Sequence, residues 1–400
     1  MAAGGGGRSA PIPRVASSRR RIQAAAWALL LAGFVASGCR PVAEARATLP
    51  PGDYTPREEH RLKLPKDRAQ QIRDAALRRA RVWREPAVPV EKFDFRANPP
   101  GPGAFRLDQE VVCRFQPEDA KGYSPKFHCV LPGGDLVKVK YGHQSTEVRT
   151  EVAATRLLSA LGFGADRMYV VRKVRCFGCP QYPYPKAYWA EALLIDFDKY
   201  ADFDFVAIER TFEGRKIATD ASEGWSWAEL DRLDPRQGAS PRAEVDALRL
   251  MAVFLNNWDN KDDNNRLVCL PGEWSEETAS CSASFALIHD VGSGFGPRQL
   301  DLEGWRSTPV WADEASCRVS MRALPYQGVT FGEPQISEAG RQFLARRLRQ
   351  LSDGQLRDLF VAARFTGHDG SPAAGKQVDD WVRAFDDRVR QIADRAPCPR

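Results

Sequence analysis

The change of hydrophobic period near residue 145 constrains this fold more than any other feature of the sequence. Residues 126–131 and 136–141 alternate apolar and polar side chains around a Pro-Gly-Gly-Asp turn. From Thr146 to Leu161 the apolar residues instead recur at helical spacing, and Gly162 follows. Alternation around a turn predicts a β-hairpin, and the helical period predicts an amphipathic helix directly after it. A hairpin followed by such a helix favours an α+β fold.

The rest of the chain extends this pattern in two halves. Further strands are expected at 110–115, 168–175 and 187–195, and helices at 242–257, 337–351, 353–363 and 377–395. This order predicts one domain over 105–396, with a β-rich lobe at about 105–200 and a helical lobe at about 201–396. Residues 40–104, with one helical stretch near 57–84, are expected to be a tether and N-terminal extension outside the core.

The N-terminus has the organisation of a signal peptide, assigned to residues 1–39. A basic region ends at Arg19–Arg21, an apolar run covers 22–35, and Ala-Ser-Gly-Cys39 follows like a lipobox, although Ala36 stands where leucine is commonest. The apolar run is shorter than the roughly 20 residues that span a bilayer. We therefore expect export and lipidation of Cys39, which would attach the chain to a periplasmic or surface membrane face. A signal without lipidation is the alternative.

The other eight cysteines fit an exported protein, because compartments outside the cytoplasm are oxidising and favour disulfides. Cys176 with Cys179, and Cys269 with Cys281, are close in sequence, but sequence alone does not give the pairing. The Cys176–Cys179 pair also resembles half of a zinc site, although no histidines stand at matching spacing, so a local disulfide is favoured.

The net charge of +6 comes from 58 basic and 52 acidic residues, and several excess arginines lie in the leader. This balance does not indicate nucleic acid binding.

A strand lysine and a helix glutamate form the first candidate site. Lys138 and Lys140 share one face of the strand at 136–141. On the following helix, Glu147 and Glu151 lie on a largely apolar stripe. A buried glutamate requires a cation, so one of the lysines is expected to pair with a glutamate of this helix. A surface lysine and a solvated glutamate are the simpler alternative.

The second candidate site is the polar run Asn256–Asn265, which directly follows an apolar helix. Asp259 and Asn264 are five residues apart, which is the spacing of the catalytic Asp and the metal-binding Asn in kinase catalytic loops. Asn257-Trp258 replaces the usual His-Arg before the Asp. A calcium-binding EF-hand is rejected, because Lys261 and Leu270 would occupy ligand positions.

The third candidate is Asp290, which begins an Asp-x-Gly sequence after the apolar strand at 285–289. Kinases place their second metal ligand in this way. His289 has no serine or cysteine partner in the sequence and is interpreted as a strand-end residue.

These three segments, in this order, resemble the secretory-pathway kinases typified by the Golgi casein kinase. TEVAATRLLSALGF at 150–163 is similar to their glutamate-bearing helix, and NNWDNKDDNN and IHDVGSGFG are similar to their catalytic and metal-binding segments. The likeness extends to HipA-like and type II phosphatidylinositol kinase-like proteins and covers roughly 126–296, by motif order and not by close identity.

The resemblance implies a two-lobed protein-kinase-like fold and a role for each candidate residue. Lys140 or Lys138 would contact the phosphates of ATP or another nucleotide, and Glu151 would position that lysine, with Glu147 in reserve. Asp259 would be the catalytic base, and Asn264 and Asp290 would bind Mg²⁺ or Mn²⁺. The acceptor hydroxyl, on a protein, a lipid or a small molecule, is not indicated.

Two departures from the family keep other functions open. No Gly-x-Gly-x-x-Gly loop is present, and an exported protein meets no ATP pool of its own. A catalytically inactive binding module tethered to the cell envelope is one alternative. A nucleotidyl transferase that uses the same metal and lysine is the other.

Overall fold

The computed structural model describes residues 45–57, 61–117, 124–143, 145–180, 183, 195–325, 330–365 and 372–399. The predicted signal peptide, the lipidation candidate Cys39 and most of the predicted strand 187–195 lie outside these residues. From residue 44 onward the chain forms one compact unit.

The N-terminal sheet closes on itself. Strand β2 pairs with β3, β3 with β4, β4 with β6 and β6 with β5, and the parallel pair between β5 and β2 completes the ring. β1 pairs with the first residues of β6, outside this ring. The strands are β1 (Ala45–Arg46), β2 (Glu110–Gln116), β3 (Lys126–Val130), β4 (Leu136–Lys140), β5 (Arg167–Phe177) and β6 (Lys199–Arg210).

The alternation in these strands separates a packed face from a polar face. Phe127 and Val139, paired across β3 and β4, are buried, and Phe127 packs on Phe203 of β6 at 4.8 Å between ring centroids. Lys140 pairs with Lys126 on the opposite face. The sheet therefore turns its lysines toward the next element of the chain.

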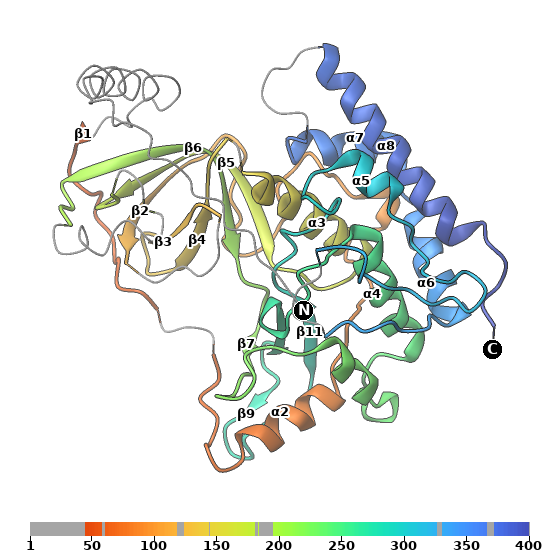
Figure 1. Cartoon of the computed structure of the whole chain (residues 1–400). Helices are drawn as coiled ribbons and strands as arrows, with labels where there is room; N and C mark the ends of the chain where they lie inside the picture. Colours follow the sequence, from red (N-terminus) through yellow and green to blue (C-terminus); the bar gives the residue numbers. More distant parts are fainter. Residues whose placement is uncertain are drawn as a thin grey trace, which may run out of the picture. The chain divides into compact units, whose positions relative to one another are not determined.

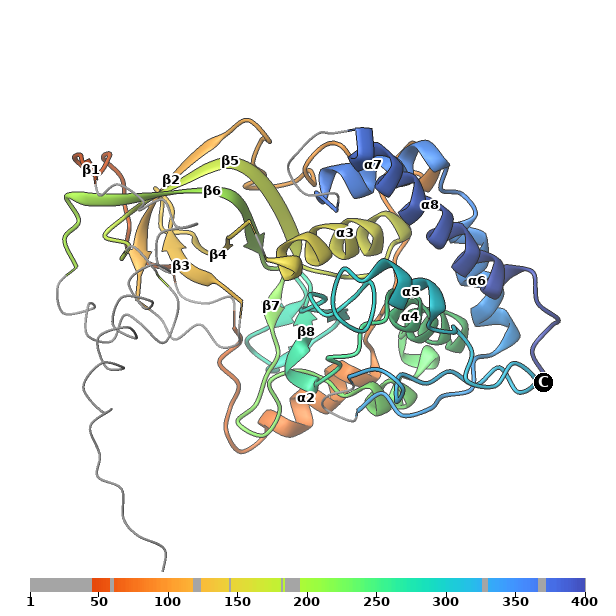
Figure 2. The same cartoon turned by 45° about the horizontal axis from the view of Figure 1, so that its top comes forward.

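That element is α3 (Thr146–Leu161), which ends where the sequence predicts. The Ser145 hydroxyl accepts a hydrogen bond from Val148 N at the start of the helix. Gly162 ends it at φ 90°, and a Cβ there would lie 2.3 Å from the Arg84 carbonyl oxygen, so only glycine fits. Figures 1 and 2 show α3 between the strands of the closed sheet and the C-terminal helices.

The C-terminal half is mainly helical, as predicted. Its helices are α4 (Arg242–Leu255), α5 (Leu302–Ser307), α6 (Glu338–Leu348), α7 (Asp353–Ala362) and α8 (Pro372–Ala393), with short 3-10 turns η3 (Trp227–Arg232), η4 (Pro235–Gln237) and η5 (Asp262–Asn264). A small sheet, β7 (Arg215–Lys216), β8 (Asn265–Cys269) and β11 (Ser284–Ile288), lies beside the hairpin β9 (Trp274–Ser275) and β10 (Ser280–Cys281).

The extension before residue 105 is part of the core, which corrects the expectation that it lies outside. Helix α2 (Ala69–Arg78) and the turn η1 (Val90–Lys92) follow an extended segment. Leu77, Val82 and Phe95 are buried in the same hydrophobic cluster as α3 and α4. The predicted helix near 57–84 was therefore too long, since the residues after α2 are extended and packed.

Strand β6 was missed by the sequence analysis, although it is the strand that closes the sheet. Asp202 and Asp204 alternate with Phe203 and Phe205 in its sequence, which is the period-2 pattern of a strand. Its register places Glu209 opposite Lys138 of β4.

Four disulfides join the eight cysteines, two of them in the near-neighbour pairs noted above. They are Cys113–Cys129, Cys176–Cys179, Cys269–Cys281 and Cys317–Cys398. Four disulfides are compatible with an exported protein. Among the described residues, none of the helices has both the length and the apolar character required to cross a membrane.

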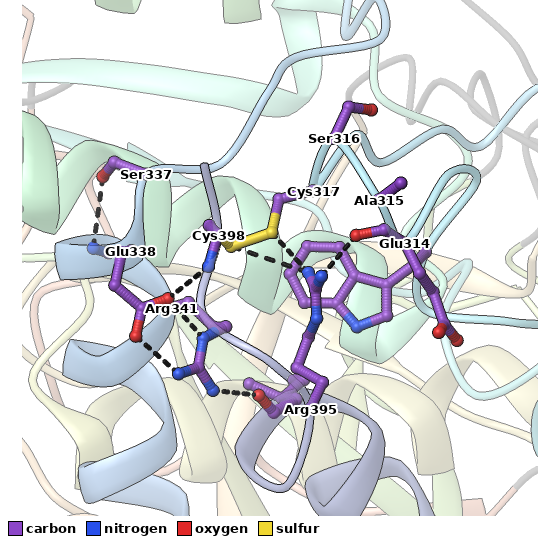
Figure 3. The surroundings of a disulfide bond; sticks show 12 residues. Glu314, Ala315, Ser316, Cys317, Ser337, Glu338, Arg341, Arg395 and Cys398 are labelled. Atoms are coloured by element: carbon purple, nitrogen blue, oxygen red, sulfur yellow. Dashed lines mark hydrogen bonds and ion pairs between the residues drawn. A yellow bond between two sulfur atoms is a disulfide. The ribbon is translucent and has the colours of Figure 1, made fainter. Parts of the chain in front are cut away.

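The Cys317–Cys398 disulfide fastens the C-terminal tail beside the start of α6 (Figure 3). Cys398 N donates to Glu338 Oε2 at 2.8 Å. Arg341 donates to both oxygens of Glu338 and, at 2.7 Å, to the Ile392 carbonyl oxygen. The tail, α6 and the end of α8 are therefore held by one polar network.

Candidate functional site

Lys140 is the strand lysine that pairs with the predicted helix glutamate. Its Nζ lies 2.5 Å from Glu151 Oε1, and the two side chains are 1% and 3% exposed. Burial disfavours the charged ammonium, but Glu151, Glu147 and Glu209 outweigh it and raise the pKa of Lys140 well above its usual range. Lys140 is therefore a fixed, buried positive charge at the interface between β4 and α3.

Glu147, one turn before Glu151, also contacts Lys140, with Oε1 at 3.3 Å from Nζ. The Ser124 hydroxyl donates to its other oxygen. A Cβ on Gly292 would lie 2.4 Å from Glu147 Cγ, so the absence of a side chain there lets α3 approach the Asp-x-Gly segment. The reserve candidate is thus part of the same cluster.

Lys138, the alternative phosphate-contacting candidate, has a different partner. Its Nζ lies 2.7 Å from Glu209 Oε1, whereas Lys140 Nζ lies 3.5 Å from Glu209 Oε2. Burial raises the pKa of Glu209, but Lys138 and Lys140 outweigh it and hold this pKa well below its usual range. Lys138 is consequently paired within the sheet, with a glutamate of β6.

The hairpin of β8 and β11 brings Asn264 and Asp290 together. Asn265 pairs with Ile288 at its open end, so the residues just outside the ladder face each other. The Asn264 carbonyl oxygen accepts from His289 N at 2.8 Å and from Asp290 N at 3.0 Å. Two residues 26 positions apart are therefore joined through the backbone.

Asp259 lies on the loop between α4 and β8. Asn256 ends α4 in the left-handed conformation at φ 56°, and Arg388 donates to its Oδ1 at 3.1 Å as well as to the Val253 and Phe254 carbonyl oxygens. Burial lowers the pKa of Arg388 to about 9. This arginine fixes the end of α4, and with it the start of the polar loop.

The loop is also tied to the Asp-x-Gly segment. Asp259 N donates to Ser293 Oγ at 3.2 Å, and Ser293 Oγ donates to Asn257 Oδ1 at 2.9 Å. Asn264 Nδ2 donates to the Asp259 carbonyl oxygen at 2.6 Å, which leaves the Asn264 Oδ1 as the atom available to a ligand. The Asp259 carboxylate is 27% exposed and lies 3.2 Å from Lys261 Nζ.

The oxygen donors around Asp290 are of the kind that Mg²⁺ and Mn²⁺ prefer. One oxygen each of Glu147, Glu151 and Asp290 lie within 4.8 Å of one another. Two oxygens bound to one Mg²⁺ at about 2.1 Å lie about 3 Å (cis) or about 4.2 Å (trans) apart. Small shifts of these three side chains would therefore bring their oxygens to the spacing of metal ligands. Glu151 Oε2 is buried and has no hydrogen-bond partner among the described residues. These residues therefore fit a divalent cation.

Charge in this cluster also favours a cation. Burial raises the pKa of Glu151 well above its usual range, and Asp290 and Glu147 raise it further against the opposing effect of Lys140. Burial also raises the pKa of Asp290, but Lys140 outweighs it and holds this pKa at about 2. Three carboxylates thus act on the Lys140 ammonium, and Lys126 also interacts with Glu147 and Asp290.

A second buried cluster, which the sequence analysis missed, lies behind Asp290. Asp166 Oδ2 accepts from His289 Nδ1 at 2.5 Å and from Arg266 Nη1 at 3.1 Å, and its Oδ1 accepts from Phe212 N at 2.7 Å. Burial raises the pKa of Asp166, but Arg266 and His289 outweigh it and lower this pKa overall. Asp166 lies between α3 and β5, where no local sequence pattern indicates a functional residue. Glu209, whose carboxylate lies near the Asp166 carboxylate and the His289 ring, could have been found only through the alternating pattern of β6.

A surface cavity of about 690 Å³ is lined by residues 61–64, 66, 69, 70 and 218–221 and includes none of the residues above. The candidate site therefore rests on its polar contacts and not on a cavity.

Together these elements define a two-lobed, kinase-like α+β fold, so the predicted fold class is confirmed. A strand lysine paired to a helix glutamate precedes a helical half, in which a polar loop and an Asp-x-Gly segment flank a hairpin.

No protein-family model and no curated protein matches this chain. Among solved structures, the chain is similar to a Helicobacter pylori proinflammatory kinase, CtkA. The TM-score is 0.40 and the identity 12%, over 72% of this chain and 95% of that chain.

Proposed function

We propose that this chain is an exported, metal-dependent, kinase-like phosphotransferase that acts on a hydroxyl acceptor. It would use ATP or another nucleotide with Mg²⁺ or Mn²⁺. One observation carries the proposal: Lys140 and Asp290 meet the same pair of glutamates on α3, while the Asp290 backbone is bonded to Asn264. This proximity supports the proposal, because a phosphotransfer site needs a lysine and metal ligands close to one another.

In this proposal, Lys140 binds nucleotide phosphate, and Glu151 fixes the direction of its ammonium. Asp290, Asn264 and the glutamates of α3 hold the metal. When bound, a divalent cation would offset the negative charge on the phosphates.

Asp259 accepts the proton of the acceptor hydroxyl. The hydroxyl oxygen forms a bond to the γ-phosphorus, and the bond from that phosphorus to the β–γ bridging oxygen breaks, which releases the nucleoside diphosphate. The exposure of Asp259 supports this role, because an acceptor must reach it from solvent.

The sequence before residue 40 supports the location. A basic and apolar leader that ends in Ala-Ser-Gly-Cys39 fits export and lipid attachment to the cell envelope. Incorporation of a labelled fatty acid into the wild-type chain, and its loss in Cys39→Ser, would test this part alone.

Radioactive ATP, labelled on either the γ- or the α-phosphate, tests the reaction in the presence of Mn²⁺. We expect γ-label, and no α-label, to appear on the chain itself or on an acceptor from an envelope extract, and to be lost in Asp259→Asn. Transfer of α-label would instead show a nucleotidyl transferase. Transfer of neither label would leave a nucleotide-binding module.

A further inference from the structure

We infer that Asp166 is a positioning residue for the metal site, acting through His289 and Arg266. This inference rests on the proposed function, because it concerns the placement of Asp290 and Asn264. In the described part of the chain, the polar partners of Asp166 are Phe212, Arg266 and His289, and not Asp290 or Asn264 themselves. It acts on their neighbours, since His289 immediately precedes Asp290 and Arg266 is the second residue after Asn264.

The hydrogen bonds assign one tautomer to His289. Carboxylate oxygens only accept, so His289 Nδ1, 2.5 Å from Asp166 Oδ2, carries a proton. Arginine only donates, so His289 Nε2, 3.1 Å from Arg266 Nη2, is the acceptor. The imidazole is therefore neutral, and both of its nitrogens are fixed. A ring rotation or a change of tautomer would break both bonds.

The same carboxylate joins the two halves of the chain. Asp166 lies just before β5, and its carboxylate accepts a hydrogen bond from the N–H of Phe212, which follows β6 and leads into the helical half. Backbone bonds run beside it, because Ile288 N donates to the Gly164 carbonyl oxygen at 3.2 Å. The hairpin that carries Asn264 and Asp290 is thus attached to the N-terminal sheet at Asp166.

This arrangement explains why a strand-end histidine is paired with a buried carboxylate. Side chains that orient metal ligands from behind typically change metal affinity tenfold to a hundredfold when they are removed. Asp166 satisfies the geometry of such a group, and its side chain is only 1% exposed, so solvent cannot replace it.

Asp166→Asn tests the inference, because asparagine keeps the size but presents an N–H toward His289 or Arg266. The matched control is Asp246→Asn. Asp246 is a buried aspartate that likewise accepts from a backbone N–H, that of Ser337, and from arginines, but lies on α4 away from the site.

Two readouts are made on the full chain. The first is the ¹⁵N spectrum of its histidine rings. We expect His289 to be protonated on Nδ1 in the wild type and in Asp246→Asn, and to change its spectrum in Asp166→Asn. The second is the affinity for ATP with Mn²⁺. We expect it to fall at least tenfold in Asp166→Asn only, even though both variants lose thermal stability.

The double variant Asp166→Asn with Arg266→Gln supplies a rescue. The asparagine amide would donate to His289 Nδ1, and the glutamine oxygen would accept from Nε2–H. Both ring nitrogens would again have a partner, but the ring would now be the opposite tautomer. We expect it to bind Mn²⁺-ATP more tightly than Asp166→Asn.

Equal losses of affinity in Asp166→Asn and Asp246→Asn, or an unprotonated His289 Nδ1 in the wild type, would overturn this inference but not the proposed function. A wild-type chain without metal-dependent nucleotide binding would overturn the proposed function, and this inference with it.

Discussion

Lys140 Nζ and Glu151 Oε1 lie 2.5 Å apart with almost no access to solvent, and they join the closed sheet to the helix that covers it. Glu147 of the same helix and Glu209 of β6 also contact this ammonium. One buried charge therefore organises side chains from three elements.

Lys140→Met is expected to lower the free energy of unfolding by about 3–5 kcal/mol, because it leaves buried carboxylates without their cation. Nucleotide binding should be lost as well. Lys138→Met is the matched control, since Lys138 lies on the same strand face but is 22% exposed and contacts Glu209. It should destabilise less and retain binding, as measured by urea unfolding and nucleotide titration. Loss of nucleotide binding in Lys138→Met, with binding retained in Lys140→Met, would show that Lys138 contacts the phosphate and would contradict this prediction.

Glu338 gives the stability of the C-terminal half a dependence on acid pH. The Arg341 guanidinium is the main cause that lowers the pKa of Glu338 to about 2, and the Cys398 N–H adds to it. The folded chain therefore binds this proton less readily than the unfolded chain, so the stabilisation is present above about pH 4.5 and is lost as the pH falls toward 2.

Glu338→Gln should consequently be less stable than the wild type at pH 6, and the difference should shrink between pH 4.5 and pH 2. Thermal unfolding across this range measures it. Glu303→Gln is the control, because Glu303 also lies in the first turn of a helix and pairs with an arginine three residues later but is 77% exposed. A difference that is constant with pH would show that Glu338 stabilises the fold without its charge.

The Cys317–Cys398 disulfide closes a loop over 81 residues of sequence separation. Replacing both cysteines with serine should lower the free energy of unfolding by about 2–5 kcal/mol, because the unfolded chain regains the freedom of that long loop. The Cys269–Cys281 disulfide spans 12 residues and should contribute less in the same experiment. Denaturant unfolding without reductant compares the two double variants, and a larger effect of the shorter loop would contradict this account.

Local signals in the sequence were sufficient for several elements. Helix α3 begins after Ser145 and ends at Gly162, and both residues act through neighbours within one turn. Strands β2 to β5 also follow their alternation closely. The buried role of Leu77 and Phe95 was not predictable, because Pro- and Arg-rich surroundings resemble a tether and their partners lie far along the chain.

The partners within the site were harder to predict for the same reason. Lys138 and Lys140 share one face, so only the register with β6 and the position of α3 decide which of them meets Glu151. Glu209 and Asp166 acquire their partners by long-range pairing, and no local pattern specifies such pairs. The order of the lysine, glutamate and aspartate segments, in contrast, is visible directly in the sequence, which is why the fold class was predictable.

In the proposed function, Asp290 and its neighbours form a metal-dependent nucleotide site. Thermal unfolding of the chain without its leader, with ATP and with or without Mn²⁺, tests it most directly, with Asp290→Asn beside the wild type and Asp263→Asn as an exposed control from the neighbouring loop. We expect ATP with Mn²⁺ to raise the melting temperature of the wild type and of Asp263→Asn by several degrees. ATP alone should raise it much less, and Asp290→Asn should not respond. An unchanged melting temperature of the wild type at millimolar nucleotide and metal would contradict it.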